Sequence, residues 1–207
     1  PLDGELPDAG IVPVRDADPH GRAAGAGPEI RFALDHEPLT RVLLDPHRQG
    51  RIPERITHND TKINNVLLHD RTGRGVCVID LDTVMPGLAL YDFGDMVRTA
   101  TCPAAEDERD LGKIAVQAPL FEALVRGFLE TAGPCLTPLE VALLPEAGML
   151  ITFETGLRFL TDHLAGDTYF KVHRPGHNLD RCRTQFALVR SMEQTRDELA
   201  RRVAAHA

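Results

Sequence analysis

One stretch of this 207-residue chain constrains its fold more than any other: residues 58–82, HNDTKINNVLLHDRTGRGVCVIDLD. Two short apolar runs, 66–69 and 76–81, stand on either side of a turn that contains two glycines, and this pattern predicts a β-hairpin. Polar side chains precede the first run, and two carboxylates, Asp80 and Asp82, close the second. Because hairpin strands are antiparallel, we expect the residues at its two outer ends to meet.

The polar cluster has the spacing of a catalytic loop. His58, Asp60 and Asn65 reproduce a His-x-Asp motif with an asparagine five residues after the aspartate, as in phosphoryl-transfer enzymes. That chemistry needs a carboxylate to accept a hydroxyl proton and oxygen ligands to hold Mg²⁺. We therefore predict Asp60 as the catalytic base, and Asn65 with Asp80 as the Mg²⁺ ligands of the cofactor site.

The same pattern suggests roles for other residues of the loop and hairpin, and two of the roles have a structural alternative. Lys62 is a candidate catalytic residue that stabilises charge on the transferring phosphate, or a solvated loop lysine. Asp82 is a candidate ligand for a second ion or a metal-bound water, provided that strand geometry continues beyond Asp80. Asp60 itself could simply cap its own turn. His58 is expected to shape the loop by packing and hydrogen bonding rather than to transfer protons.

The triplet Asp92-Phe93-Gly94 matches a kinase metal-binding motif by its letters, but its position argues against that role. The metal-binding carboxylate of such enzymes ends the strand that pairs with the strand of the catalytic loop, and Asp80 occupies that place. We expect Asp92 to brace a helix start or a loop, and Asp95 to pair with Arg98 along a helix.

Composition excludes several classes of function. The formal charge is -8, and no run of basic residues offers a site for nucleic acid or an anionic membrane. No apolar run is long enough to span a bilayer, and no signal-peptide pattern is found, so we predict a cytoplasmic protein. Four cysteines without a C-x-x-C pair are expected to be reduced and mostly buried: Cys77, Cys102, Cys135 and Cys182.

The remaining pattern predicts a mostly helical α+β protein. Residues 1–27, rich in Gly, Pro and Ala, indicate a linker or tail, and residues 28–207 form the single domain. Pro38 should interrupt the first helix, and Thr137 should open a long helix with a capping box, kinked by Pro145. The expected helices cover residues 28–37, 90–100, 114–131, 138–164 and 178–203.

The chain also resembles a known family. Its segments HNDTKINN, VIDLDTVMPGLALYDFGD with Arg98, GLRFLTDHLAGDTYF and HNLDRCRTQ are similar to those of N-acetylhexosamine kinases in the aminoglycoside phosphotransferase and choline kinase superfamily, over about residues 50–195. The resemblance implies a protein-kinase-like fold and transfer of the ATP γ-phosphate to the anomeric hydroxyl of N-acetylglucosamine or N-acetylgalactosamine. It also implies Asp60 as base, in contact with the substrate, and Asn65 and Asp80 as magnesium ligands.

In this resemblance, Arg158 and Tyr169 match positions that bind the sugar. Arg158 offers several donors for hydroxyls or an acetamide oxygen, and Tyr169 can cover a sugar face. A helix-surface arginine and a core-edge tyrosine are equally good interpretations of the same residues. Asp162, His163 and Asp167 are weaker candidates nearby.

The chain departs from the family at its N-terminal side. No glycine-rich strand-turn-strand and no strand lysine of the Val-Ala-Ile-Lys type precede His58. We therefore expect a C-terminal lobe whose N-terminal lobe is missing and which is inactive alone. Two alternatives stay open: a catalytically incomplete binding remnant, or a kinase for an aminoglycoside, choline or homoserine.

Overall fold

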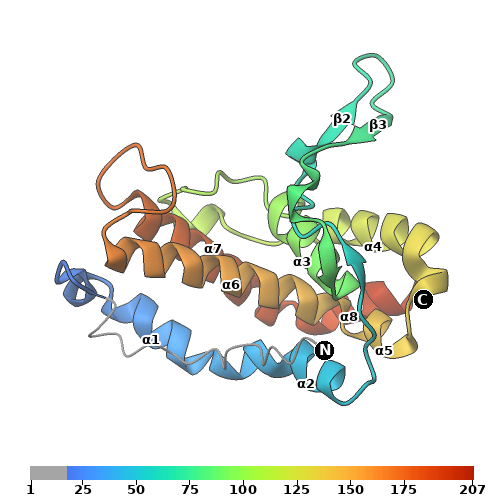
Figure 1. Cartoon of the computed structure of the whole chain (residues 1–207), viewed down its shortest axis with the longest axis horizontal. Helices are drawn as coiled ribbons and strands as arrows, with labels where there is room; N and C mark the ends of the chain where they lie inside the picture. Colours follow the sequence, from blue (N-terminus) through green and yellow to red (C-terminus); the bar gives the residue numbers. More distant parts are fainter. Residues whose placement is uncertain (1–17) are drawn as a thin grey trace, which may run out of the picture.

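The computed structural model describes residues 18–207 and shows a mostly helical α+β protein with a projecting β-hairpin (Figure 1). Six short 3₁₀ helices connect the larger elements: Arg22–Gly25, Glu37–Thr40, Ile63–Asn65, Leu81–Thr83, Leu111–Lys113 and Gly133–Cys135. The α-helices are α1 (Gly27–Asp35), α2 (Arg41–Arg48), α3 (Ala89–Ala100), α4 (Ala118–Ala132), α5 (Pro138–Ala142), α6 (Leu144–Ala165), α7 (His177–Gln194) and α8 (Arg196–Ala204).

The strands form two small antiparallel pairs. β2 (Val66–Leu68) pairs with β3 (Gly75–Val78) as the predicted hairpin, with Val66 opposite Val78. β1 (Arg55–Thr57) pairs with β4 (Met85–Gly87), which the sequence did not predict. This second pair brackets the catalytic loop and the hairpin, so both are anchored to the helical body at their base.

The second hairpin strand ends earlier than predicted. β3 stops at Val78, and Asp80 adopts a left-handed backbone with φ of 64°. Asp and Asn tolerate this conformation better than most residues because their short polar side chains can bond locally. The chain then turns through the 3₁₀ helix Leu81–Thr83, so the strand geometry assumed for Asp82 is absent.

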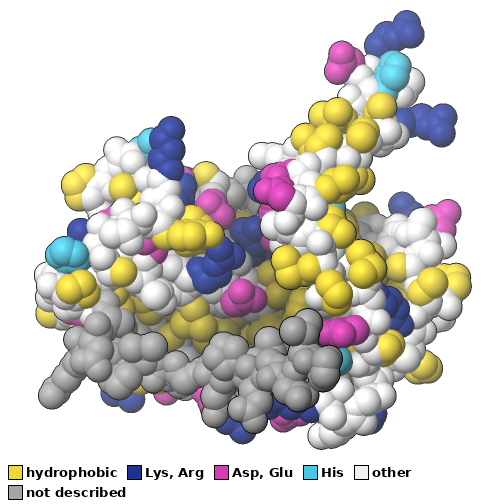
Figure 2. All heavy atoms as spheres, viewed as in Figure 1, with side chains coloured by type: hydrophobic (Ala, Val, Ile, Leu, Met, Phe, Trp, Pro, Cys, Tyr) yellow, Lys and Arg dark blue, Asp and Glu magenta, His cyan; other side chains and the backbone are white. Residues whose placement is uncertain are grey.

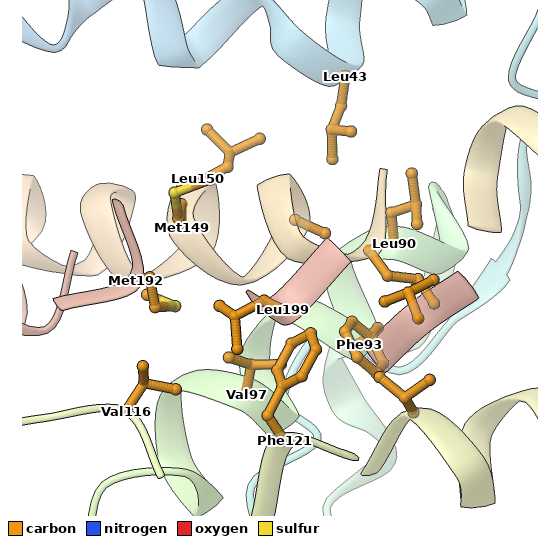
Figure 3. Packing of buried hydrophobic residues seen from close by; sticks show 14 of the residues in the cluster. Leu43, Leu90, Phe93, Val97, Val116, Phe121, Met149, Leu150, Met192 and Leu199 are labelled. Atoms are coloured by element: carbon orange, nitrogen blue, oxygen red, sulfur yellow. The ribbon is translucent and has the colours of Figure 1, made fainter. Parts of the chain in front are cut away.

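The main core forms where α6 packs against α3 and α7 (Figure 3). Phe93 of α3 is fully buried and meets Phe121 of α4 edge to face, with ring centroids 5.9 Å apart. A second cluster joins Phe32 of α1 to Phe153 of α6 and Phe186 of α7. The packed helices thus form the body from which the hairpin projects.

Gly94 allows α3 to cross α6 closely. A Cβ at this position would lie 2.5 Å from both the carbonyl oxygen of Ala147 and Cγ1 of Ile151. We expect Gly94→Ala to lower the free energy of unfolding by about 2–3 kcal/mol, because backbone must move to make room. Gly127→Ala on α4 meets no atom within 4 Å and should instead stabilise by about 0.5–1 kcal/mol. Urea denaturation of both variants measures the contrast, and equal effects would contradict it.

Several predicted helix boundaries were wrong. Pro145 does not kink a long helix, because α5 ends at Ala142 and Pro145 lies in the first turn of a new helix, α6. The predicted capping box at Thr137 is confirmed, and its Glu140 also pairs with Arg55 of β1 at 2.5 Å. The last helix divides at Thr195, and α4 begins at Ala118 rather than at residue 114.

The linker predicted for residues 1–27 falls partly outside the described residues, since residues 1–17 are not described. Within the described part, Arg22 bonds to Asp167 and Ala26 is fully buried, so packing begins before residue 28. The cysteines are free thiols as predicted, but the prediction that they are mostly buried was wrong. Of the four, only Cys182 is buried. Cys77 is exposed because its hairpin projects from the core, and Cys135 is exposed in the short 3₁₀ helix after α4.

Across residues 18–207, no helix combines the length and the apolarity that crossing a bilayer requires.

Candidate active site

The predicted catalytic loop, residues 58–65, runs from β1 to β2 and is held by hydrogen bonds to Asp92 of α3. One carboxylate oxygen of Asp92 accepts a hydrogen bond from the backbone N–H of His58 at 2.9 Å, and the other accepts from that of Asn59 at 2.8 Å. The hydroxyl of Thr61 donates to the backbone oxygen of Asp92 at 2.6 Å. The predicted loop-bracing role of Asp92 is confirmed.

His58 and Asn59 tie the loop to the residues that follow the hairpin. The ring of His58 bonds to the carbonyl of Ile79 at 3.2 Å, and its own carbonyl accepts from the hydroxyl of Thr83 at 2.6 Å. Asn59, in a left-handed conformation, donates its side-chain amide to the carbonyl of Thr83 at 3.1 Å. These bonds agree with the loop-shaping role predicted for His58.

Asp60 lies at the centre of a small polar cluster. Its Oδ2 accepts from Nζ of Lys62 at 2.6 Å and from the side-chain amide of Asn65 at 2.8 Å. Partial burial acts to raise the pKa of Asp60, but the bonds from Lys62 and Asn65 outweigh it and hold that pKa below its ordinary value. The carboxylate is therefore ionised and oriented at neutral pH.

Asn65 is almost fully buried and connects Asp60 to the base of the hairpin. Its amide nitrogen also donates to the backbone oxygen of Asp60 at 2.8 Å, whereas no described residue donates to its Oδ1. That oxygen is therefore free to bind a cation. An asparagine so positioned presents a neutral ligand and holds the aspartate in place.

Asp80 and Asp82 lie at the end of the hairpin and contact each other. The hydrogen bond and the repulsion from Asp82 raise the pKa of Asp80 above its ordinary value, and the charge of Asp60 adds to this effect. The left-handed turn at Asp80 brings the two carboxylates together, although the strand geometry assumed for Asp82 is absent. Neighbouring carboxylates that repel each other can be relieved by a divalent cation.

A cavity of about 720 Å³ opens beside Asp60 and Lys62. Figure 2 shows this hollow, with acidic and basic side chains gathered in it, between the hairpin and the loop that joins α6 to α7. Its size falls in the range of small-molecule sites. Asp80 and Asp82 do not line it.

Arg158 and Tyr169, the two substrate residues implied by the resemblance, both line this cavity. The guanidinium of Arg158 lies 5.8 Å from the ring centre of Tyr169 and 5.4 Å from that of Phe170, as in cation–π contacts. Tyr169 is 73% exposed. The structure therefore brings these two residues to the same cavity as Asp60.

Asp162, His163 and Asp167 do not line the cavity. Asp162 accepts hydrogen bonds from the backbone N–H groups of Thr168, Tyr169 and Phe170, so it fixes the loop that carries Tyr169. Burial acts to raise the pKa of Asp162, but these donors lower it below its ordinary value. Asp162 therefore supports a loop that lines the cavity, and none of the three weaker candidates lines it directly.

Sequence reasoning missed other charged residues of the cavity. Asp95 and Arg98 were predicted only as a helix pair; they bond at 2.7 Å, and Arg98 also binds Glu106 at 3.2 Å. Glu154 and Lys171 gave no signal beyond the spacing of Glu154 four residues before Arg158 on α6. In all, the lining carries five basic and four acidic side chains: Lys62, Arg98, Arg158, Lys171 and Arg181 against Asp60, Asp95, Glu106 and Glu154.

Comparison with protein families places this site in context. The model of the APH phosphotransferase enzyme family matches residues 13–131, which is more than half of the chain. The chain belongs to this phosphotransferase family. The family lies in the aminoglycoside phosphotransferase and choline kinase superfamily, whose members are small-molecule kinases. The match includes the catalytic loop, the hairpin and α3 of this phosphotransferase, and it ends in α4, before Arg158 and Tyr169.

Kinases of this family generally use ATP and Mg²⁺. Within residues 18–207, no group of three or more His, Cys, Asp or Glu side chains could hold a metal without other ligands. The sequence-predicted ligands Asn65, Asp80 and Asp82 offer one amide oxygen and two carboxylates at the base of the hairpin. Oxygen donors of this kind are the type that Mg²⁺ takes, commonly one or two carboxylates together with substrate phosphates.

Proposed function

We propose that this chain is the C-terminal lobe of an ATP- and Mg²⁺-dependent kinase that phosphorylates a sugar, with the anomeric hydroxyl of N-acetylglucosamine or N-acetylgalactosamine as acceptor. The observation that carries the proposal is the position of Asp60. Its carboxylate is held by Lys62 and Asn65 at the edge of a polar cavity large enough for a sugar. A base that faces the acceptor site is the central requirement of phosphoryl transfer.

In this proposal, Asp60 orients the acceptor hydroxyl and takes its proton as the new O–P bond forms. The lowered pKa of Asp60 keeps it ionised and able to accept a hydrogen bond from the hydroxyl. Lys62 holds the carboxylate in place and brings a positive charge beside the phosphate that is transferred.

Asn65, Asp80 and Asp82 are the proposed ligands for Mg²⁺ bound with ATP. The cation would neutralise charge on the phosphates and align them. Asn65 contributes its Oδ1, and the two aspartates contribute carboxylates at the same base of the hairpin, where the backbone N–H of Ile79 donates to the carbonyl of Asn65 at 2.9 Å. Because the side chain of Asn65 also donates to Asp60, it connects the proposed metal-binding site to the proposed catalytic base.

Arg158 and Tyr169 are the proposed acceptor-binding residues, because both line the cavity that contains Asp60. The exposed tyrosine ring is available to cover a sugar face, and the guanidinium can donate to hydroxyls or to an acetamide oxygen.

The surface of the hairpin supports a role for a second lobe. Figure 2 shows apolar side chains along the projecting hairpin, and an apolar patch of this kind marks an interaction site. We assign this apolar patch to contacts with the bound nucleotide and with an N-terminal lobe. The exposed apolar residues of the hairpin and of the segment that follows it are Leu67, Leu68, Val76, Val78, Ile79, Leu81, Val84 and Met85.

The function is tested by incubating the full-length protein with Mg-ATP and single acceptors, and following products by ³¹P NMR. We expect ADP and a sugar 1-phosphate from N-acetylglucosamine or N-acetylgalactosamine, with phosphorus coupled to the anomeric proton. The methyl glycoside, whose anomeric oxygen is blocked, should give no product. Phosphorylation of kanamycin, choline or homoserine in preference to either sugar would contradict the proposed acceptor.

A further inference from the structure

Glu154 differs from the other acids of the cavity because it has no ion partner among the described residues. Asp60 pairs with Lys62, Asp95 pairs with Arg98, and Glu106 lies within reach of both Arg98 and Arg181. Glu154 lines the same cavity, but no Lys, Arg or His of residues 18–207 forms an ion pair with it. One carboxylate of the cavity is therefore left without donors from the protein.

The nearest candidate partner, Arg158, lies one helical turn away on α6 but is engaged elsewhere. Its guanidinium lies over the rings of Tyr169 and Phe170. The side chain of Glu154 is exposed to the cavity. Desolvation by the surrounding protein raises its pKa, and the charges of Arg158 and Arg98 only partly oppose that effect. Its two oxygens are therefore open to hydrogen-bond donors that a ligand supplies.

We propose that Glu154 selects the acceptor by accepting hydrogen bonds from two of its donor groups, either neighbouring hydroxyls or a hydroxyl and an amide N–H. This inference rests on the function proposed above and deepens it. The two oxygens of a carboxylate match the spacing of vicinal sugar hydroxyls, and each such charge-assisted bond is stronger than a neutral one.

The cavity lacks the surplus of carboxylates that a polycationic acceptor would need. Five basic and four acidic side chains line it, so their formal charges nearly balance. An aminoglycoside polycation therefore gains no electrostatic advantage there over an uncharged polyol. Glu154 therefore recognises donors on a neutral ligand and does not act as a counterion for an ammonium group.

The test is calorimetric titration of the full-length protein with N-acetylglucosamine and with its 3-deoxy, 4-deoxy and 6-deoxy derivatives, for wild type and Glu154→Gln. Loss of the recognised hydroxyl should weaken wild-type binding about tenfold or more. In Glu154→Gln, the affinity for N-acetylglucosamine should fall by a similar factor. The affinity of this variant for the same deoxy derivative should be lower than its affinity for N-acetylglucosamine by less than about threefold. The expected result is therefore that removing one hydroxyl lowers affinity strongly in wild type and only weakly in Glu154→Gln.

Glu130→Gln on the exposed face of α4 is the matched control and should bind every sugar as wild type does. If Glu154→Gln binds the sugar as tightly as wild type, or if every deoxy derivative affects both proteins equally, the role of Glu154 is refuted. Tighter binding of kanamycin than of N-acetylglucosamine to wild type also refutes it. If wild type binds none of the sugars and phosphorylates none of them, the proposed function itself is wrong.

Discussion

Asp60→Asn is expected to lower kcat of the proposed kinase reaction by about 10² to 10⁴-fold, the range associated with loss of a general base. Asparagine has nearly the same shape as aspartate, but its amide can neither take the proton of the acceptor hydroxyl nor carry a negative charge beside Lys62. The loss should appear mainly in kcat, because Arg158 and Tyr169 are unchanged and continue to line the cavity.

The same substitution should leave the fold intact. The side chain of Asp60 is 25% exposed and that of Lys62 is 37% exposed, and such partly exposed ion pairs contribute about 0–1 kcal/mol. The melting temperature should therefore change by only a few degrees. Steady-state kinetics at saturating Mg-ATP and a thermal melt measure the two effects separately.

Asp70→Asn provides the control, since it makes the same chemical change on an exposed residue of the hairpin turn. It should alter neither kcat nor the melting temperature. Turnover by Asp60→Asn within about threefold of wild type would remove Asp60 from the role of base, because the loss of a proton acceptor cannot be so small.

The local parts of the fold could be predicted from the sequence. The hairpin follows from two apolar runs around a glycine turn, and the capping box follows from Thr137 and Glu140. Both depend on residues close together in the chain. The pairing of β1 with β4 could not be predicted, because it joins Thr57 to Met85 across the whole hairpin, and three-residue strands carry little periodic signal.

The helix breaks at Leu143 and Thr195 were also missed, for a related reason. Thr195 is followed by neither glycine nor proline, and Pro145 is compatible with the first turn of a helix as well as with a kink. The packing of α8 against α4 and α5 decides where the last helix turns. Such a choice depends on tertiary contacts that local propensity does not contain.

The residues that line the cavity beside Asp60 were the hardest part of the site to predict from the sequence. Glu154 on a helix surface looks like an ordinary solvated glutamate. It becomes part of a cavity because the loop with Asp60, α3 and the loop with Tyr169 and Phe170 meet around α6. That loop is positioned by Asp162, which the resemblance suggested as a weak substrate candidate and which the structure shows as its brace.

Asp92→Ala is the second change with a large expected effect, because one side chain holds two backbone groups of the catalytic loop. Without the carboxylate, the N–H groups of His58 and Asn59 lose their acceptors. Hydrogen bonds to charged groups contribute about 1.5–3 kcal/mol each, so we expect the free energy of unfolding to fall by about 2–4 kcal/mol. Urea denaturation monitored by circular dichroism measures this loss.

The same variant should also lose turnover, although Asp92 does not line the cavity. Asp60 follows directly after the two released amides, so the base loses its fixed position, and a displacement of about 1 Å can cost about 10²-fold in rate. The assay is run at a temperature where denaturation shows the variant to be more than nine-tenths folded. A role confined to stability would leave kcat unchanged under these conditions.

Asp92→Asn separates the two bonds, because its amide retains one acceptor oxygen and turns an N–H₂ group toward the other amide. We expect a loss of stability intermediate between wild type and Asp92→Ala, with a matching intermediate loss of kcat. Because the hydroxyl of Thr61 bonds to the backbone oxygen of residue 92, that contact persists in both variants. If Asp92→Ala unfolds at the urea concentration of wild type, then Asp92 does not brace the loop, and the position of Asp60 depends on its other contacts, with Lys62 and Asn65.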